Sequence, residues 1–343
     1  MSLKWLAIYF LTFLLSLLLA LYATPIARKA AIKFGIVDRP DGSLKHQREP
    51  VPYLGGLAIY MAYLLSLSLT FEFSRDLLAI MLGGTIIVLL GLIDDFGVLK
   101  PEAKLAGQVI AAIVLMKAGA MINLTFIPLW LRVFLTGVWI VGVTNAFNII
   151  DVMDGLSAGV AVIAAVTLSI VAMENGRITV AVMAASLAGA ALGFLKYNFH
   201  PARIYMGDTG SMFIGFTLSA LAIGNTAGGY TKMSVYGFLA PVMILGVPVF
   251  DTLFVMFFRA RRGQSMFYGS NDHFAIRLRK AGWPIRRIAA ASYAASALLS
   301  AAALTLMRLT HRPYIYLCLG LVLAAVLCAA YLLGRIRMED GVV

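Results

Sequence analysis

The sequence predicts an all-α, polytopic integral membrane protein with about eleven transmembrane helices. Of the 343 residues, 61% are hydrophobic and only 13% are charged, which is unlike the composition of a soluble domain. Apolar runs of about 17–22 residues, long enough to cross a bilayer core, recur along the whole chain. Polar residues lie in short connections between these runs, so we expect a single membrane domain over residues 1–343.

The apolar runs predict the spans in chain order. They cover residues 3–24, 53–71, 77–95, 103–119, 130–148, 156–173, 178–195, 211–226, 234–258, 287–308 and 313–334. The runs 103–119 and 211–226 are short or interrupted. The first run is too long for the core of a signal peptide, and no small-residue cleavage pattern follows it, so we expect it to be retained.

Basic residues set the expected orientation. The net charge is +12, and most Lys and Arg residues fall in alternate connections. The positive-inside rule then places the N-terminus outside and the C-terminus in the cytoplasm. The predicted cytoplasmic loops are about 25–52, 95–102, 149–155, 196–210 and 259–286. Because the basic residues are spread over many short loops, the lipid bilayer is an expected partner and nucleic acid is not.

Aspartates gather on the same predicted side. The aspartates at the cytoplasmic ends of spans or in the loops there are Asp94, Asp95, Asp151, Asp154, Asp208 and Asp272. An ionisable residue at the membrane boundary is costly, which favours a functional site. A lipid or sugar transporter is the alternative class, but it would hold such groups near the bilayer midplane. A layer at one surface instead fits a reaction between a water-soluble donor and a lipid headgroup.

Asp94 and Asp95 end the third run, in GLIDDFGVLK. Neighbouring residues on a helix point about 100° apart, so one carboxylate can face a metal while the other faces a substrate. A plain pair of helix-end residues is the alternative, but negative charge is unfavourable at a helix C-terminus.

The segment NAFNIIDVMDGL, residues 145–156, repeats polar side chains at a spacing of three. On a helix, Asn148, Asp151 and Asp154 would form one stripe of oxygen atoms for a hard cation or a nucleotide. Helix capping would explain one of these residues but not the whole set.

The segment NFHPARIYMGDTGS, residues 198–211, precedes another apolar run. Asp208 or Thr209 is expected to cap the following helix, whose free N–H groups suit a phosphate. Gly207 and Gly210 would let the backbone approach a ligand.

Two basic loops offer further anion-binding side chains. Lys45, His46 and Arg48 could meet a lipid phosphate, although a solvated basic loop is an equal alternative. The loop 259–287 adds His273, Arg277 and other arginines. Asp251 lies inside an apolar run, and the sequence assigns it no role.

Taken together, residues 37–283 resemble the polyprenyl-phosphate N-acetylhexosamine-1-phosphate transferase superfamily. The Asp94–Asp95 pair and the strings NxxNxxDxxDGL and NxxPAxxxMGDxGS occur in order. PVFDT at residues 248–252 is similar to the bacterial undecaprenyl-phosphate N-acetylglucosamine-1-phosphate transferase branch. The phospho-N-acetylmuramoyl-pentapeptide transferase of peptidoglycan synthesis is the alternative within the superfamily.

The resemblance implies a set of site residues. They are the catalytic pair Asp94 and Asp95; the Mg²⁺ ligands Asp208 and Asn148, with Mn²⁺ as the alternative ion; the nucleotide-binding Tyr205 and Asp154; and the phosphate-binding Lys104. The polar strings and the basic loops themselves add Asp151 and Asn198 as nucleotide-binding candidates, and Lys45, His273 and Arg277 as phosphate-binding candidates. Two positions depart from the family pattern. Val152 replaces a glycine beside the uracil position, and His273 is all that remains of a His-x-His-His run.

The implied reaction moves a sugar 1-phosphate, N-acetylglucosamine 1-phosphate in the expected branch, from a UDP-N-acetyl amino sugar to undecaprenyl phosphate and releases UMP. The product would start synthesis of a cell-envelope glycan. The resemblance also implies a bacterial cytoplasmic (inner) membrane location with the active site facing the cytoplasm, and it leaves a homodimer open.

Overall fold

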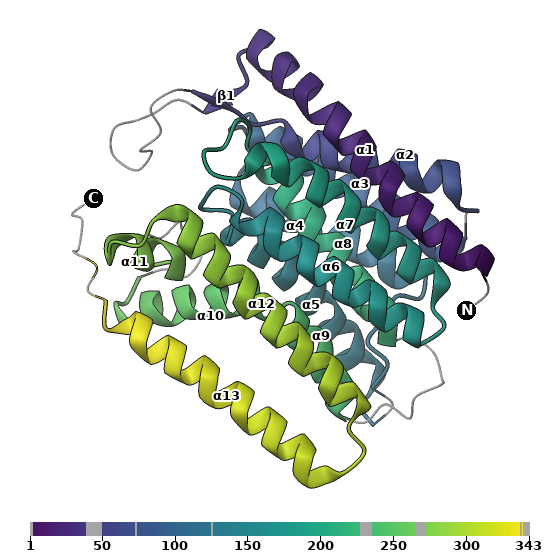
Figure 1. The fold of residues 1–343 in the computed structure, drawn as a ribbon, viewed down its shortest axis with the longest axis vertical. Helices are drawn as coiled ribbons and strands as arrows, with labels where there is room; N and C mark the ends of the chain where they lie inside the picture. Colours follow the sequence, from purple (N-terminus) through teal and green to yellow (C-terminus); the bar gives the residue numbers. More distant parts are fainter. Residues whose placement is uncertain are drawn as a thin grey trace.

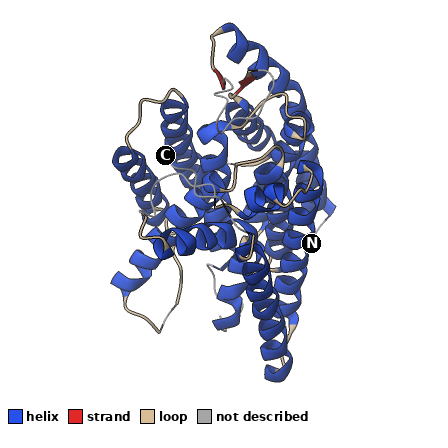
Figure 2. Ribbon diagram, turned by 90° about the vertical axis from the view of Figure 1, so that its left-hand side faces the viewer, coloured by secondary structure: helices blue, strands red, loops and turns tan. Residues whose placement is uncertain are grey.

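The computed structural model describes residues 3–38, 50–72, 74–124, 126–226, 235–264, 272–336 and 338. Nearly all of this part of the chain is helical (Figures 1 and 2). The helices are α1 (Leu3–Lys33), α2 (Gly55–Thr70), α3 (Arg75–Asp95), α4 (Pro101–Lys117), α5 (Leu129–Ile149), α6 (Leu156–Glu174), α7 (Ile178–Asn198), α8 (Gly207–Thr226), α9 (Val235–Ile244), α10 (Gly246–Arg261), α11 (Phe274–Lys280), α12 (Ile285–Arg308) and α13 (Arg312–Gly334). A small antiparallel pair joins β1 (Val37–Asp38) to β2 (Val51–Pro52).

The protein is an all-α polytopic membrane protein. Among the described residues, seven helices are long and apolar enough to cross a bilayer, namely α1, most of α3, α5, α6, α7, α12 and α13. The helices α2, α4 and α8 cover three further predicted runs. The total of about eleven spans and the orientation of the termini remain predictions.

Two predicted boundaries were wrong. Helix α1 continues through Pro25 to Lys33, so the predicted loop starting at residue 25 begins later. The predicted span 234–258 is two helices that meet at Leu245. Pro248 has no N–H to offer the carbonyl of Ile244, which explains the break at this point.

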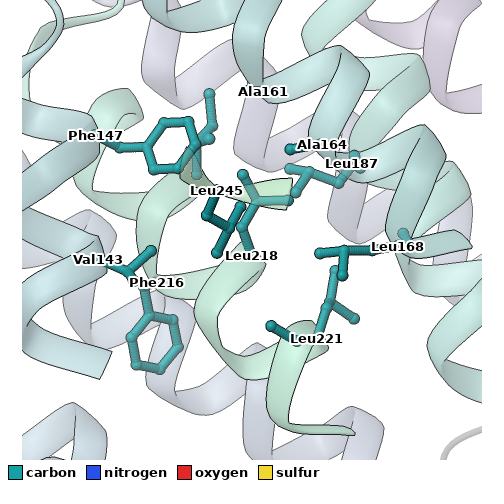
Figure 3. Close-up of a cluster of buried hydrophobic side chains, with 14 of the residues drawn as sticks. Val143, Phe147, Ala161, Ala164, Leu168, Leu187, Phe216, Leu218, Leu221 and Leu245 are labelled. Atoms are coloured by element: carbon teal, nitrogen blue, oxygen red, sulfur yellow. The ribbon is translucent and has the colours of Figure 1, made fainter. Parts of the chain in front are cut away.

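The centre of the bundle is built from α6, α7 and α8. Of the 18-residue apolar stretch in each helix, 72% is buried in α6 and in α7, whereas 0% is buried in α13. Helix α13 therefore lies at the edge of the bundle (Figure 1). Phe147, Leu187 and Leu218 come from three different helices and meet in the core (Figure 3). Small residues allow this close packing, since a Cβ atom added to Gly189 of α7 would lie 2.4 Å from the Phe13 carbonyl oxygen of α1.

Glycines also bring the start of α8 against two other helices. A Cβ atom on Gly56 of α2 would lie 2.1 Å from the Gly210 nitrogen, and one on Gly91 of α3 would lie 2.6 Å from Thr209 Cα. The backbone N–H of Gly56 donates to Met206 O at 2.9 Å. The first turn of α8, with Asp208 on it, is therefore held close to the C-terminal end of α3 and its two aspartates.

Candidate active site

The ammonium group of Lys104 contacts side chains from three other helices. Lys104 Nζ on α4 lies 2.7 Å from Asp94 Oδ2 on α3 and 3.1 Å from Asn148 Oδ1 on α5, and it also pairs with Asp208 Oδ2 on α8. We call Asp94, Lys104, Asn148 and Asp208 the Lys104 cluster. The Lys104, Asp94 and Asp208 side chains are 19%, 17% and 33% exposed, so the cluster is accessible to a ligand.

The Asn148 amide joins the cluster to the first turn of α8. Its Nδ2 donates to Asp208 Oδ1 at 2.9 Å and to Ser211 Oγ at 3.0 Å. The Ser211 hydroxyl donates in turn to Gly207 O at 3.0 Å. Asn148 and Asp208, the predicted metal ligands, are therefore in direct contact although 60 residues separate them.

The two neighbouring aspartates have different partners. Asp94 faces Lys104, whereas Asp95 Oδ1 accepts from the Asp208 N–H at 2.7 Å, and its Oδ2 accepts from the Thr209 N–H at 3.2 Å and the Thr209 hydroxyl at 2.5 Å. Asp95 thus caps α8, where a negative charge is favourable. We infer that Asp94 acts in the Lys104 cluster and that Asp95 positions Asp208.

This arrangement corrects two predictions about the start of α8. The cap is Asp95 from α3, not Asp208 or Thr209. The N–H groups of Asp208 and Thr209, which we expected to be free for a phosphate, are already bonded to the Asp95 carboxylate. A phosphate near this turn would instead meet the Lys104 side chain.

Gly207 provides a test of the cap. Its φ is +68°, and an added Cβ atom would lie 2.6 Å from both Asp95 carboxylate oxygens. We expect Gly207→Ala to displace Asp95 and to destabilise the protein by about 2–4 kcal/mol, the sum of backbone strain and a lost cap. Thermal unfolding in detergent measures the change.

Gly176→Ala is the matched control, because Gly176 has the same φ of +68° and nothing lies within 4 Å of its added Cβ atom. Equal losses of Tm in the two variants would show that the contact with Asp95 contributes nothing to stability.

A pair of amide side chains links α4 to α5 next to the cluster. Gln108 Nε2 donates to Asn145 Oδ1 at 3.2 Å, and Asn145 Nδ2 donates to Gln108 Oε1 at 2.7 Å. Gln108 lies one turn after Lys104 on α4, so the pair fixes the α4 face that presents Lys104. We did not predict a role for Gln108 from the sequence. Its position four residues after Lys104 places both side chains on one face of a helix, which could have indicated it.

The predicted polar stripe after Asn148 does not continue as a helix. Helix α5 ends at Ile149, so Asp151 and Asp154 lie in the following loop rather than on its surface. Gly155 ends this loop with a φ of +73°, a conformation that favours glycine.

Two loops carry the predicted nucleotide residues, and side chains tie these loops together. Asp154 Oδ2 accepts from the Ala202 N–H at 3.0 Å and lies 2.7 Å from His200 Nδ1. Asn198 is 3% exposed; its Oδ1 accepts from the Gly155 N–H, and its Nδ2 donates to Ile204 O, each at 3.0 Å. Asn198 therefore holds the 150–155 loop against the 199–206 loop. The contact of His200 with Asp154 was not predicted from the sequence.

Tyr205 and Asp151 lie at this junction. Burial, with the charges of Asp154, Asp38 and Asp151, raises the pKa of Tyr205, so its hydroxyl stays protonated. Burial and the charges of Asp208, Asp95 and Asp154 raise the pKa of Asp151 to about 8. A cation bound among these carboxylates would favour the ionised form of Asp151.

The other predicted phosphate-binding residues have different settings. Lys45 lies outside the described residues. His273 Nδ1 lies 2.7 Å from Oδ2 of the fully buried Asp251, whose Oδ1 accepts from the Phe274 N–H at 3.0 Å. This pair fixes the start of α11, which gives Asp251 the structural role that the sequence did not reveal.

Arg277 does not have the setting expected of a phosphate ligand. It is 1% exposed; its guanidinium donates to Asp272 Oδ1 at 2.8 Å and to Ile336 O at 2.9 Å, and it lies 4.2 Å from the Phe258 ring centre. These contacts join α10, α11 and the end of α13. The sequence pattern could not distinguish this buried contact from an anion site.

The donor set of the Lys104 cluster suits a hard cation. Two carboxylates and one amide oxygen already surround the Lys104 ammonium. Mg²⁺ prefers such oxygen atoms, and it is commonly bound by one or two carboxylates with water and substrate phosphates completing its shell. In the described part of the chain no group of three His, Cys, Asp or Glu residues forms a metal site. The substrate would therefore have to complete the coordination.

The part of the chain that carries this site is similar to known proteins. Residues 77–225, which contain the whole Lys104 cluster, match the family model described as Glycosyl transferase family 4. The chain is 36% identical over 275 residues to a Bacillus subtilis protein named "Probable undecaprenyl-phosphate N-acetylglucosaminyl 1-phosphate transferase", covering 78% of this chain and 76% of that protein.

Two other relatives differ in the activity that they are named for. A Mycolicibacterium smegmatis decaprenyl-phosphate N-acetylglucosaminephosphotransferase is 34% identical to this chain, and the match covers 78% of this chain and 74% of that protein. A phospho-N-acetylmuramoyl-pentapeptide-transferase of Halalkalibacterium halodurans is also 34% identical, and the match covers 81% of this chain and 90% of that protein.

Proposed function

Because the chain belongs to glycosyl transferase family 4, we propose that it transfers a sugar 1-phosphate from a UDP-N-acetyl amino sugar to undecaprenyl phosphate. An oxygen of the lipid phosphate forms a bond to the β-phosphorus of the donor, the bond from that phosphorus to UMP breaks, and UMP leaves. The observation that carries the proposal is the convergence of Asp94, Lys104, Asn148 and Asp208 at one accessible point.

The reaction has an electrostatic requirement, because an anionic lipid phosphate must approach an anionic pyrophosphate. Lys104 offers a fixed positive charge to these groups, held in place by oxygen atoms from three other helices. Asp208 and Asn148 would hold Mg²⁺, which when bound would neutralise phosphate charge. Asp94 would orient Lys104 and the attacking phosphate, while Asp95 keeps the first turn of α8 in position.

The joined 150–155 and 199–206 loops provide a place for the nucleotide. Tyr205 would stack on the uracil ring, and Asp154 and Asp151 would face its polar edge. Asp154 already holds the 199–206 loop through the Ala202 N–H, so it would act as both a loop anchor and a base contact. Asn198 would act through the loops, since both ends of its amide bond to backbone groups.

We further propose that the site faces the cytoplasm of a bacterial inner membrane. Helices α1 and α13 run in the same direction through the bundle, so the start of α1 and the end of α13 lie at opposite ends (Figure 1). Most Lys and Arg residues fall in the predicted cytoplasmic loops, and these loops include the ones that carry Asp154 and Asp208, which supports a cytoplasmic assignment of the site.

N-acetylglucosamine is the proposed sugar, on the strength of the relatives named for it. The pentapeptide-transferase relatives supply a second candidate donor. Purified protein with undecaprenyl phosphate and Mg²⁺ can be given UDP-N-acetylglucosamine, UDP-N-acetylgalactosamine or UDP-N-acetylmuramoyl-pentapeptide, with UMP release as the measurement. We expect kcat/KM to be at least about 100-fold higher for UDP-N-acetylglucosamine than for the pentapeptide donor.

A preference for the pentapeptide donor would move the protein to the peptidoglycan branch. UMP release with none of the three donors would refute the transfer reaction and restore the transporter alternative.

A further inference from the structure

A cationic cavity lies where α1 meets the 199–206 loop, beside the proposed site. It has a volume of about 180 Å³ and is lined by Thr24, Pro25, Arg28, Lys29, Tyr197, Arg203 and Ile204. Its volume is several times the roughly 30 Å³ that a water molecule occupies in the liquid.

Hydrogen bonds between α1, the end of α7 and the following loop fix the walls of this cavity. Arg28 Nε donates to Arg203 O at 3.0 Å, and the Tyr197 hydroxyl donates to Leu21 O at 3.1 Å. The Arg203 N–H donates to Tyr197 O at 2.8 Å. These hydrogen bonds hold the elements that line the cavity in fixed positions, so the cavity is not a gap between independent side chains.

The charges of the lining residues favour an anion. Arg28, Lys29 and Arg203 bring three positive charges, and no carboxylate lines the cavity. Within the described residues, none of these three side chains forms a salt bridge. A phosphate would pair with these guanidinium and ammonium groups, for which the described residues provide no carboxylate partner.

The approach to the cavity is apolar. Leu18, Tyr22 and Ile26 of α1 are 53%, 73% and 50% exposed and are spaced four residues apart, so they form one stripe along the membrane-spanning helix. Lys29 follows at the next turn of the same face. Acyl chains lying along this stripe would place a phosphate headgroup among the three basic side chains.

We propose that the cavity binds the phosphate headgroup of an anionic phospholipid of the surrounding bilayer. The headgroup would bridge α1 and the loop that carries Tyr205, and so would hold that loop against the bundle. This lipid is distinct from the polyprenyl phosphate substrate, which has to reach the Lys104 cluster.

Lipid retention tests the proposal without any sugar donor, so its result does not depend on the proposed reaction. The protein is reconstituted in phosphatidylcholine nanodiscs with or without phosphatidylglycerol, extracted in detergent and analysed by native mass spectrometry. We expect wild-type protein to retain phosphatidylglycerol, and Lys29→Gln/Arg203→Gln to lower the retained fraction about tenfold.

Lys33→Gln/Lys280→Gln is the matched control, because it removes two exposed basic residues outside the cavity. It should retain phosphatidylglycerol like wild type. Equal loss in both double variants would show a general effect of surface charge and overturn the proposal, as would no loss in the cavity variant.

Competitors distinguish the sources of phosphate. Neither inorganic phosphate nor undecaprenyl phosphate should displace the retained phosphatidylglycerol. Displacement by inorganic phosphate would show a free-anion site, and displacement by undecaprenyl phosphate would show a substrate subsite; either result would overturn the proposal.

Discussion

Asp208→Ala should lower kcat for Mg²⁺-dependent UMP release by about 10³-fold or more while the protein still folds. The carboxylate is bonded to both Lys104 and Asn148, and it is a proposed Mg²⁺ ligand. Its removal takes away charge that holds the cation and one partner that fixes Lys104. Lys104 keeps its contact with Asp94, so the helices need not separate.

Glu102→Gln is the matched control for this variant. Glu102 is an exposed carboxylate in the first turn of α4, two residues from Lys104, and should change kcat less than about twofold. The intensity of the folded-protein peak in size-exclusion chromatography checks that both variants fold. A normal Mg²⁺-dependent rate in Asp208→Ala would refute the proposed metal ligand.

Asp94→Asn and Asp95→Asn should fail in different ways. In Asp94→Asn the amide oxygen can still accept from Lys104, so Tm should stay close to that of wild type while kcat falls by about 10²–10³-fold. In Asp95→Asn the cap loses charge-assisted bonds to two N–H groups and one hydroxyl of α8. The expected destabilisation is about 1.5–3 kcal/mol, together with a loss of rate because Asp208 is displaced.

Measurement of Tm and kcat on the same preparations separates the two roles. A normal rate in Asp94→Asn would rule out a chemical role for Asp94. An unchanged Tm in Asp95→Asn would show that the cap does not stabilise α8.

The sequence predicted the helices well because long apolar runs are a strong and local signal. It failed at Leu245, where Pro248 acts on the carbonyl four residues earlier and splits an apolar run that composition alone would make continuous. It also placed the α1 boundary too early, since Pro25 is accommodated within the helix.

The sequence indicated some residues of the candidate site but not the contacts between them. The polar strings indicated Asp94, Asn148 and Asp208, yet the partner of Asp95 lies 113 residues further along the chain, and no local pattern shows that. Arg277 has the residue type of an anion ligand, but its burial between Asp272 and the end of α13 depends on how three helices pack.

The proposed transfer breaks the bond between the β-phosphorus of the donor and the oxygen that bridges it to UMP, and it leaves the bond between sugar and phosphate intact. UDP-N-acetylglucosamine labelled with ³²P at the β-phosphorus tests it directly, with undecaprenyl phosphate as the acceptor and Mg²⁺ present. We expect the label to move into the lipid fraction in a one-to-one ratio with released UMP. Label that stays in water as UDP while the sugar enters the lipid would show cleavage between sugar and phosphate and refute the proposed transfer.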